Sequence, residues 1–298
     1  MKNQFKLMAL GSDPEFIIVD QYGKGIPGSL LTSGTKDFPE YFKEEFALFK
    51  DNLTVEGNIP PCTSKKAFIE ALRFLIDTIN DRANHFTARI KYTGQYEFDS
   101  ILLESEDGQE FGCSEVQYSW NAVYFKEFND LSNPPDNTPN LGDSKLRTAG
   151  FHIHIGYGIT NATFIKKEIY DVILAKLFDM FIVLPSLYVC HEEFRTMNYG
   201  LLGNYRSKPY GLECRALSSY FTNPIFHEWI WDQIEKMFKF ANKLSEEQLL
   251  TLLLTHTYNS PTPSIIKTLL KNTFTEDISI IEESASLIKT LNYEFQTI

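Results

Sequence analysis

Hydrophobic positions along the chain fall into short strand-like runs and longer stretches with helical spacing. FIIVD at residues 16–20 and VEGNI at residues 55–59 are typical of short strands, and a further strand is predicted over residues 96–103. Apolar residues recur with a helical period after Ser64 and again over residues 166–189. Both stretches therefore predict helices, the first capped by Thr63 or Ser64. From residue 223 onward the pattern is mostly helical, with a break at SPTPS.

Proline and aspartate positions add detail to these elements. Pro60 and Pro61 are expected to end the second strand, because proline has no N–H to donate to a sheet. Asp171 and Asp179 fall opposite the apolar positions of the second helix, so we expect them on its polar side. The predicted strands come from distant positions, separated by helices and by long loops such as residues 133–143. This arrangement favours an α+β architecture over a regular βαβ array.

Composition narrows the class of protein. The chain has 298 residues, 43% of them hydrophobic, and a formal net charge of −11. A charge of this sign argues against a nucleic-acid binder, so an anionic ligand would need local cations or bound metal. The four cysteines, Cys62, Cys113, Cys190 and Cys214, show no CxxC spacing and predict neither a zinc knuckle nor a disulfide framework. We find no leader-like segment and no long apolar span, and expect a cytoplasmic protein without membrane contact.

Four short strings carry the candidate chemistry: GSDPEF (Gly11 to Phe16), VEGNIPP (Val55 to Pro61), RTAGFHIHIGY (Arg147 to Tyr157) and YRSKPYGLECR (Tyr205 to Arg215). In three of them, polar residues stand two apart inside a strand-like run, and residues i and i+2 of a strand point to the same face. These pairs are Asp13 with Glu15, His152 with His154, and Glu213 with Arg215. Each would present two polar heads to one side of a sheet.

Each motif has a functional and an ordinary interpretation. Asp13 and Glu15 suit a Mg²⁺ or Mn²⁺ ion, but a solvated pair on an edge strand would look the same. Glu56 is either a further ligand or a surface glutamate. The HIHIG run offers two imidazoles on one face with apolar residues on the other, a more specific pattern than a lone histidine.

The ECR string raises the same choice. Glu213 and Arg215 alone could form a structural ion pair. Arg206 and Lys208 lie just upstream, however, and bring three cations near one carboxylate in an acidic protein. Such a cluster is suited to holding a polyphosphate or a phosphoryl group in transfer.

Taken in this order, with the last string continuing as ECRALSSYFTNP, the motifs resemble the catalytic domain of the glutamine synthetase and glutamate–cysteine ligase superfamily. The resemblance is closest to its phage-type branch of carboxylate–amine ligases, or amidoligases, and covers Gly11 to Pro224. It implies an α+β, glutamine synthetase-like domain with a curved, mostly antiparallel sheet backed by helices. Residues 1–240 would form this domain, and residues 241–298 a C-terminal helical extension of the same unit.

The resemblance also implies roles for individual residues. The positions that match metal ligands are Asp13, Glu15, Glu56, His152 and Glu213. The positions that match groups acting on ATP and its phosphates are Arg206, Lys208, Arg215 and His154, with Arg147 placed nearby; Arg206, Arg215 and His154 would be catalytic. Asp13 departs from the superfamily, which usually has Glu there, and is shorter by a methylene. A further acidic ligand is expected among Glu104, Glu106, Glu110 and Glu115.

The implied reaction is ATP- and Mg²⁺-dependent ligation, or Mn²⁺-dependent ligation. ATP would activate a carboxylate as an acyl phosphate, and an amine of an amino acid, peptide, protein or cell-wall component would displace phosphate to give an amide. If the gene is phage-borne, the reaction would take place in the host cytoplasm. Two alternatives stay open: a phosphagen-type kinase on the same fold that stops at phosphoryl transfer, and an inactive binding or virion-associated module. The oligomeric state and the substrates are not predicted.

Overall fold

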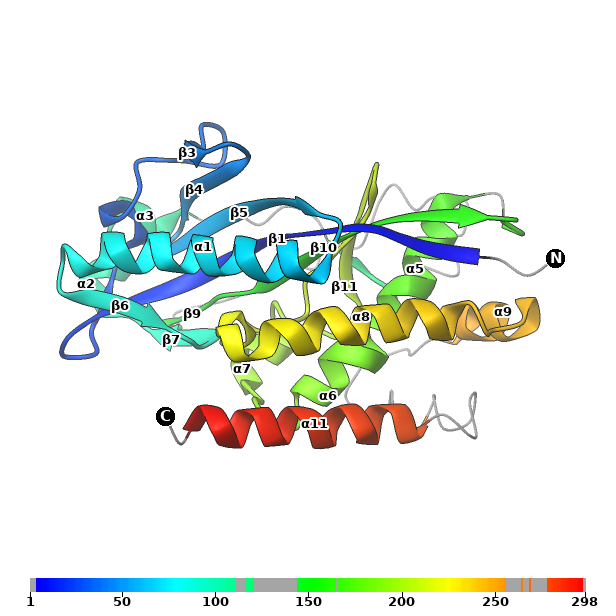
Figure 1. Cartoon of the computed structure of the whole chain (residues 1–298). Coiled ribbons are helices and arrows are strands. Elements are labelled where there is room, and N and C mark those ends of the chain that lie inside the picture. Colours follow the sequence, from blue (N-terminus) through cyan, green and yellow to red (C-terminus); the bar gives the residue numbers. More distant parts are fainter. Residues whose placement is uncertain are drawn as a thin grey trace.

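The computed structural model describes residues 4–110, 116–120, 144–164, 166–255 and 278–296, together with positions 264 and 268. A ten-stranded sheet dominates it, with a two-stranded sheet beside it (Figure 1). The strands are β1 Gln4–Asp20, β2 Gly25–Ile26, β3 Glu40–Lys43, β4 Phe46–Asp51, β5 Thr54–Cys62, β6 Ala88–Lys91, β7 Gln95–Glu97, β8 Gln117–Tyr118, β9 Leu146–Thr148, β10 Phe151–Thr160, β11 Asn204–Lys208 and β12 Gly211–Cys214.

The described residues also form α-helices, of which α1, α5 and α8 contact the large sheet. They are α1 Lys65–Asn84, α2 Ser100–Leu103, α3 Glu106–Gln109, α5 Lys167–Phe178, α6 Leu184–Ser186, α7 Glu193–Met197, α8 His227–Ala241, α9 Glu246–Leu254 and α11 Ile278–Gln296. Short 3-10 turns occupy η1 Gly28–Leu30, η3 Ser219–Thr222 and η4 Pro224–Phe226, and η2 Asp179–Val183 is a π-helical turn. None of the helices in the described ranges is long and apolar enough to cross a membrane.

The large sheet runs in the order β3-β4-β5-β1-β10-β12-β11-β8, and each pairing between its described strands is antiparallel. The long strand β1 lies at its centre, with β2 and β6 pairing its far end (Figure 1). This confirms the expected α+β class with a mostly antiparallel sheet backed by helices. The strands meet from distant parts of the chain, so residues far apart in sequence become cross-strand neighbours at the centre.

Side-chain alternation along the central strands separates a core face from a polar face. Leu10, Phe16, Ile153, Ile155 and Leu212 point toward the helices and join the main hydrophobic core. The residues between them on the same strands point the other way, as the period of two requires. The polar positions predicted from sequence therefore share the face opposite the main core.

Two predicted strands differ from the structure. β5 continues through Pro60 and Pro61 to Cys62, so the prediction that prolines end it was wrong. They are tolerated because β4 pairs β5 only as far as Asn58, and because the register with β1 is irregular between Ile59 and Cys62. The strand predicted over residues 96–103 is a strand only to Glu97. Helix α2 replaces it after Asp99, a residue type that favours turns and helix starts.

The predicted helices form with one correction. Ser64 caps α1 by accepting from the backbone N–H of Ala67, as expected. The stretch over residues 166–189 forms α5, η2 and α6 in succession. Asp171 and Asp179 are not on a polar side: both are buried, and each carboxylate has protein donors. The predicted loop at residues 133–143 lies outside the described residues.

A buried lysine joins α5 to the C-terminal helices. Lys176 is fully buried, and its ammonium donates to the carbonyl oxygens of Leu252 and Leu253 at 2.8 Å each, and to that of Thr255. These carbonyls belong to the end of α9, where the helix leaves its last acceptors without helical donors. Further along, the Tyr220 hydroxyl contacts the side chain of Asn292 on α11. The C-terminal helices α9 and α11 are thus bound to α5 and η3 by polar contacts as well as by apolar packing.

Candidate functional site

The polar face of the central strands brings together the carboxylates and imidazoles predicted from sequence. Asp13 on β1 is paired in register with His152 on β10, and Glu15 on β1 with Glu56 on β5. Side chains of directly paired residues lie on one face and close to each other. The imidazole Nε2 of His154 lies 2.8 Å from an oxygen of Asp13, and that of His152 lies 3.8 Å from Glu15.

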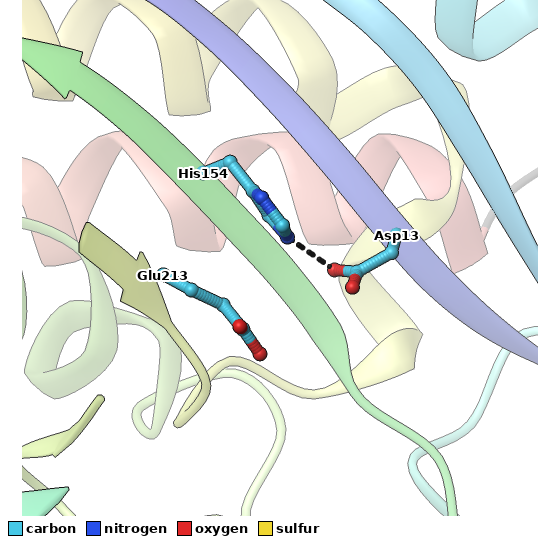
Figure 2. Close-up of side chains that lie close together, drawn as sticks. All are labelled: Asp13, His154 and Glu213. Atoms are coloured by element: carbon cyan, nitrogen blue, oxygen red, sulfur yellow. Dashed lines mark hydrogen bonds and ion pairs between the residues drawn. The ribbon is translucent and has the colours of Figure 1, made fainter. Parts of the chain in front are cut away.

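Asp13, His154 and Glu213 come from three adjacent strands and point toward one another (Figure 2). His154 Nδ1 also lies 2.5 Å from the Tyr210 hydroxyl, and the two rings are stacked. Burial alone would raise the pKa of Asp13, but the neighbouring imidazoles, His154 above all, hold it well below its usual range. The pKa of His154 is raised in turn, because Asp13 outweighs the effect of burial. Asp13 and His154 thus form a charged pair.

Glu213 is surrounded by three cations. Arg206 lies 3.2 Å from one carboxylate oxygen, Lys208 lies 2.8 Å from the other, and Arg215, one residue past the end of β12, contacts the first. Burial and Asp13 would raise the pKa of Glu213, but Arg215, His152 and Arg206 lower it to about 2. Three positive charges against one negative leave this end of the site, which we call the basic end, with an excess of cations.

Glu56 lies in the opposite environment. It is 6% exposed, and the carboxylates of Glu15 and Asp51 lie close to its own. Burial and then the charges of Asp13, Glu15 and Asp51 raise the pKa of Glu56 well above its usual value. Lys36 lies 2.7 Å from Asp51 and offsets part of this charge. We call Glu15, Asp51 and Glu56 the acidic end of the site.

Three groups of side chains have ligand atoms within 4.8 Å of one another: Asp13, His154 and Glu213; Asp13, Glu56 and His152; and Glu15, Asp51 and Glu56. Neighbouring groups share Asp13 or Glu56, so the three positions form a row across the sheet. Two of the sets have two carboxylates and one imidazole and the third has three carboxylates, and such oxygen-rich sets suit Mg²⁺ or Mn²⁺. The raised pKa of Glu56 is a second sign of fit, because clustered carboxylates repel unless a cation lies between them.

A cavity of about 200 Å³ lies against both ends of the site. Its lining from the predicted set consists of Asp13, Glu15, Glu56, Arg147, His152, Arg206 and Arg215. His154, Lys208 and Glu213 do not line it and lie beside it at the basic end. Arg147 is buried and donates to the backbone oxygens of Ser144 and Leu146, and burial lowers its pKa. The structure thus brings all ten predicted residues to one region.

Asp51 is the acidic residue that sequence reasoning missed. Among the four glutamates considered, Glu104 and Glu106 are exposed, Glu115 lies outside the described residues, and Glu110 lines the cavity but pairs with Lys50 at 3.3 Å. Asp51 ends β4, and Phe49, two residues earlier, is paired in register with Glu56. The signal was the turn-forming string DNLT between two apolar runs. It predicts a hairpin with Asp51 and Glu56 on the same face.

Arg195 was also missed; it lines the cavity and binds the backbone around the site. It is 3% exposed, and its guanidinium donates to the backbone oxygens of Ala149, Ala216 and Leu217 at 2.7 to 2.9 Å. These carbonyls lie just before β10 and just after Arg215. Arg195 therefore ties together the chain segments that carry His152 and Arg215. Nothing in the surrounding sequence marks an arginine for burial of this kind.

The second half of the chain matches a known protein family. The model of one family, phage phiEco32-like COOH.NH2 ligase-type 2, matches residues 147–298, and no curated protein matches the chain. The matched region begins at Arg147 and holds the HxH and ECR strands, whereas Asp13, Glu15, Asp51 and Glu56 precede it.

Three solved structures are similar over almost the whole chain. A novel glutamine synthase homolog has a TM-score of 0.44 at 11% identity over 98% of this chain and 66% of its own. A bifunctional glutathione synthetase from Pasteurella multocida has a TM-score of 0.44 at 10% identity, over 97% of this chain and 48% of its own. Apo GmaS has a TM-score of 0.40 at 9% identity, over 98% of this chain and 70% of its own. The chain thus spans from about half to 70% of their lengths.

Proposed function

This chain belongs to the phage phiEco32-like COOH.NH2 ligase-type 2 family, and from that premise we propose that it is a ligase that uses ATP and Mg²⁺ or Mn²⁺ to join a carboxylate to an amine. One observation carries the proposal beyond the family name. A carboxylate-rich acidic end and a cation-rich basic end adjoin one cavity. A metal–nucleotide complex has matching charges: divalent cations for the first end and phosphate oxygens for the second.

Each residue has a proposed part in holding the reactants. Asp13, Glu15, Asp51, Glu56 and His152 would hold the divalent ions, which when bound neutralise phosphate charge and fix its orientation. Asp51 is added to the predicted set because its carboxylate lies close to those of Glu15 and Glu56. Glu213 is already neutralised by three cations, so direct metal binding would replace one of those contacts. We propose that Glu213 chiefly orders the cations of the basic end.

The basic end would act on the transferring phosphoryl group. A carboxylate oxygen of the acceptor attacks the γ-phosphorus of ATP, the bond to the β–γ bridging oxygen breaks, and ADP leaves. Arg206, Lys208 and Arg215 would donate hydrogen bonds to the phosphoryl oxygens as their charge redistributes, and His154 would contact the same oxygens. Arg147 would bind the nucleotide or the acceptor carboxylate from the cavity wall.

Amide formation completes the proposed reaction. The amine nitrogen attacks the acyl carbon of the acyl phosphate, the bond from that carbon to the phosphate oxygen breaks, and the nitrogen loses a proton. The products are amide, ADP, inorganic phosphate and one proton. No side chain of the protein forms a covalent bond in this sequence, so positioning and electrostatics account for catalysis. A closed cavity would also protect the acyl phosphate from water.

Hydroxylamine trapping tests the proposal without knowledge of the natural amine. Purified protein is incubated with Mg²⁺, ATP, hydroxylamine and single carboxylates from a panel of amino and dicarboxylic acids. We expect ADP, phosphate and a hydroxamate in equal amounts, and loss of all three in Glu56→Gln but not in the exposed control Glu97→Gln. ADP with a stable phosphorylated acceptor and no hydroxamate would indicate a kinase. Absence of Mg²⁺–ATP binding by calorimetry would indicate a binding module.

A further inference from the structure

A lysine lies at the acidic end of the site and has no part in the proposed ion and phosphate contacts. Lys36 lines the cavity, and its ammonium lies 2.7 Å from a carboxylate oxygen of Asp51. Burial alone would lower the pKa of Lys36, but Asp51, Glu56 and Glu15 raise it, so the ammonium faces all three carboxylates of the acidic end. The chain thus supplies a cation of its own at the position proposed for a divalent ion.

The backbone around Lys36 is fixed beside the end of β4. The carbonyl oxygen of Gly34 accepts from the backbone N–H of Lys50 at 3.0 Å, which ties the loop to the strand. Thr35 and Phe38 exchange backbone hydrogen bonds at 3.1 and 3.2 Å and close a turn that contains Lys36. These contacts place the lysine next to the acidic end as part of the fold.

The ammonium itself has more freedom than the backbone. The side chain of Lys36 is 42% exposed, against 20% for that of Asp51. Lysine carries its charge on a flexible four-carbon stem, and ion pairs with one exposed partner are usually weak. The ammonium can therefore leave Asp51 by rotation of its stem while the loop stays in place.

A divalent ion at the acidic end and the Lys36 ammonium would compete for carboxylate oxygens. The ligand atoms of Glu15, Asp51 and Glu56 lie within 4.8 Å of one another, and the ammonium contacts one of these three residues directly. An ion held among them would lie close to the ammonium, and like charges repel strongly at short range in a partly buried site. The ion must therefore displace the ammonium or bind against its charge. In both cases Lys36 lowers the affinity of the acidic end for its ion.

We propose that Lys36 is a built-in competitor for the divalent ion at the acidic end, and that the ion displaces its ammonium from Asp51 toward the cavity. This inference rests on the proposed function, since it takes the acidic end as an ion site. Three carboxylates and one ammonium carry a formal charge of −2, which a divalent ion cancels. The cavity would therefore become favourable for an anionic nucleotide and acceptor only after the ion has bound.

Mn²⁺ titration without ATP, followed by electron paramagnetic resonance, tests this inference. Lys36→Met and Lys36→Gln should each bind the ion of the acidic end about tenfold more tightly than the wild type, because the competing charge is gone. Lys36→Arg keeps that charge and should show no such gain. Lys66→Met removes an exposed lysine of α1 and should bind as the wild type does.

A double-mutant cycle assigns the gain to the pair with Asp51. In an Asp51→Asn background the gain from Lys36→Met should fall to about twofold, because the pair is already broken. Thermal melts give a second measurement. Mn²⁺ should raise the melting temperature of Lys36→Met by more than that of the wild type, since tighter binding stabilises the fold more at the same ion concentration.

The sign of the change separates competition from support. Unchanged Mn²⁺ affinity in Lys36→Met and Lys36→Gln would overturn the inference, and so would an equal gain in Lys66→Met. Weaker binding would also overturn it and would make Lys36 a residue that positions Asp51 for the ion. Absence of Mn²⁺ binding by the wild type would overturn the proposed ion site as well, whereas wild-type binding without a gain in the variants would leave that site standing.

Discussion

Two buried glutamates on the same face of the sheet have pKa values that are shifted in opposite directions. Glu56 is 6% exposed and Glu213 is 0% exposed, so burial disfavours the charged form of both. The pKa of Glu56 rises well above its usual value, because Asp13, Glu15 and Asp51 add to the effect of burial. The pKa of Glu213 falls to about 2, because Arg215, His152 and Arg206 outweigh burial and the charge of Asp13. The difference teaches that each end of the site is incomplete in its own way: the acidic end needs a cation and the basic end an anion.

Neutralising Glu213 should have the largest effect on stability. Glu213→Gln leaves Arg206, Lys208 and Arg215 without their shared carboxylate, and breaking a buried pair in this way costs about 3–5 kcal/mol. A carboxylate with a lowered pKa stabilises the fold above its unfolded value of 4.5, and that stability is lost as pH falls toward about 2. The deficit of the variant should therefore shrink over this range. Urea unfolding of both proteins at several pH values measures it, and a constant deficit would contradict the comparison.

Removing a cation from the basic end should lower activity more than stability. Arg215→Ala deletes a group proposed to donate to the phosphoryl oxygens, and loss of one such donor costs about 10²–10³ in kcat. Arg215→Lys should recover only part of it, because an ammonium lacks the two-pronged geometry of a guanidinium. Rates of ADP release compare these variants with Arg89→Ala, an exposed control on β6. A decrease of less than fivefold in the rate of ADP release would show that Arg215 does not act on the phosphoryl group.

Neutralising Glu56 should have the opposite sign to Glu213 in the metal-free protein. Glu56→Gln removes a buried charge that its neighbours repel, so we expect the free energy of unfolding without metal to rise by about 1–2 kcal/mol. Added Mn²⁺ should stabilise the wild type and have little effect on the variant. Thermal melts with and without Mn²⁺ measure both effects. Equal stabilisation of the two proteins by Mn²⁺ would contradict an ion at the acidic end.

Asp51 and Glu110 offer a matched pair for a smaller effect. Both line the cavity, but Asp51 lies within the third ligand group and Glu110 pairs with Lys50. Asp51→Asn should weaken Mn²⁺ binding by about tenfold, as loss of one ligand among several does, and Glu110→Gln should leave it within about twofold. Mn²⁺ titration followed by electron paramagnetic resonance gives both affinities. The reverse order would make Glu110 the missing acidic ligand.

The sequence predicted which residues share the polar face of the central strands better than it predicted where strands end and how they pair. The period of two placed Asp13 with Glu15 and His152 with His154, because side chains alternate in any strand. The period alone does not bring Asp51 to Glu56, because their proximity depends on the register set by the turn at residues 52–53, and the string DNLT that marks this turn was overlooked. The end of β5 was predicted wrongly at Pro60 and Pro61 for the same reason. Whether proline ends a strand depends on which neighbour it would have paired, and that is a property of the sheet.

The buried carboxyl groups on the helical side of the sheet could not be predicted from the sequence for a different reason. Asp171 and Asp179 looked like solvent-facing positions of an amphipathic helix, yet each is buried with a partner supplied from elsewhere in the chain. Asp171 accepts from Tyr157 at 2.5 Å and Asp179 from Trp120 at 2.6 Å. Helical periodicity counts apolar residues along one segment. It cannot identify a buried polar residue whose hydrogen-bond partner comes from a distant part of the chain.

The buried ammonium of Lys176 decides how far the chain can be shortened. A fragment ending at residue 240 would keep Lys176 but lose its acceptors, the carbonyl oxygens of Leu252, Leu253 and Thr255. We propose that residues 1–240 and 241–298 form one unit for this reason, so that truncation inside α9 would yield an insoluble product. Proteolysis of the native chain should accordingly spare α9, and the shortest soluble fragment should extend at least to Thr255.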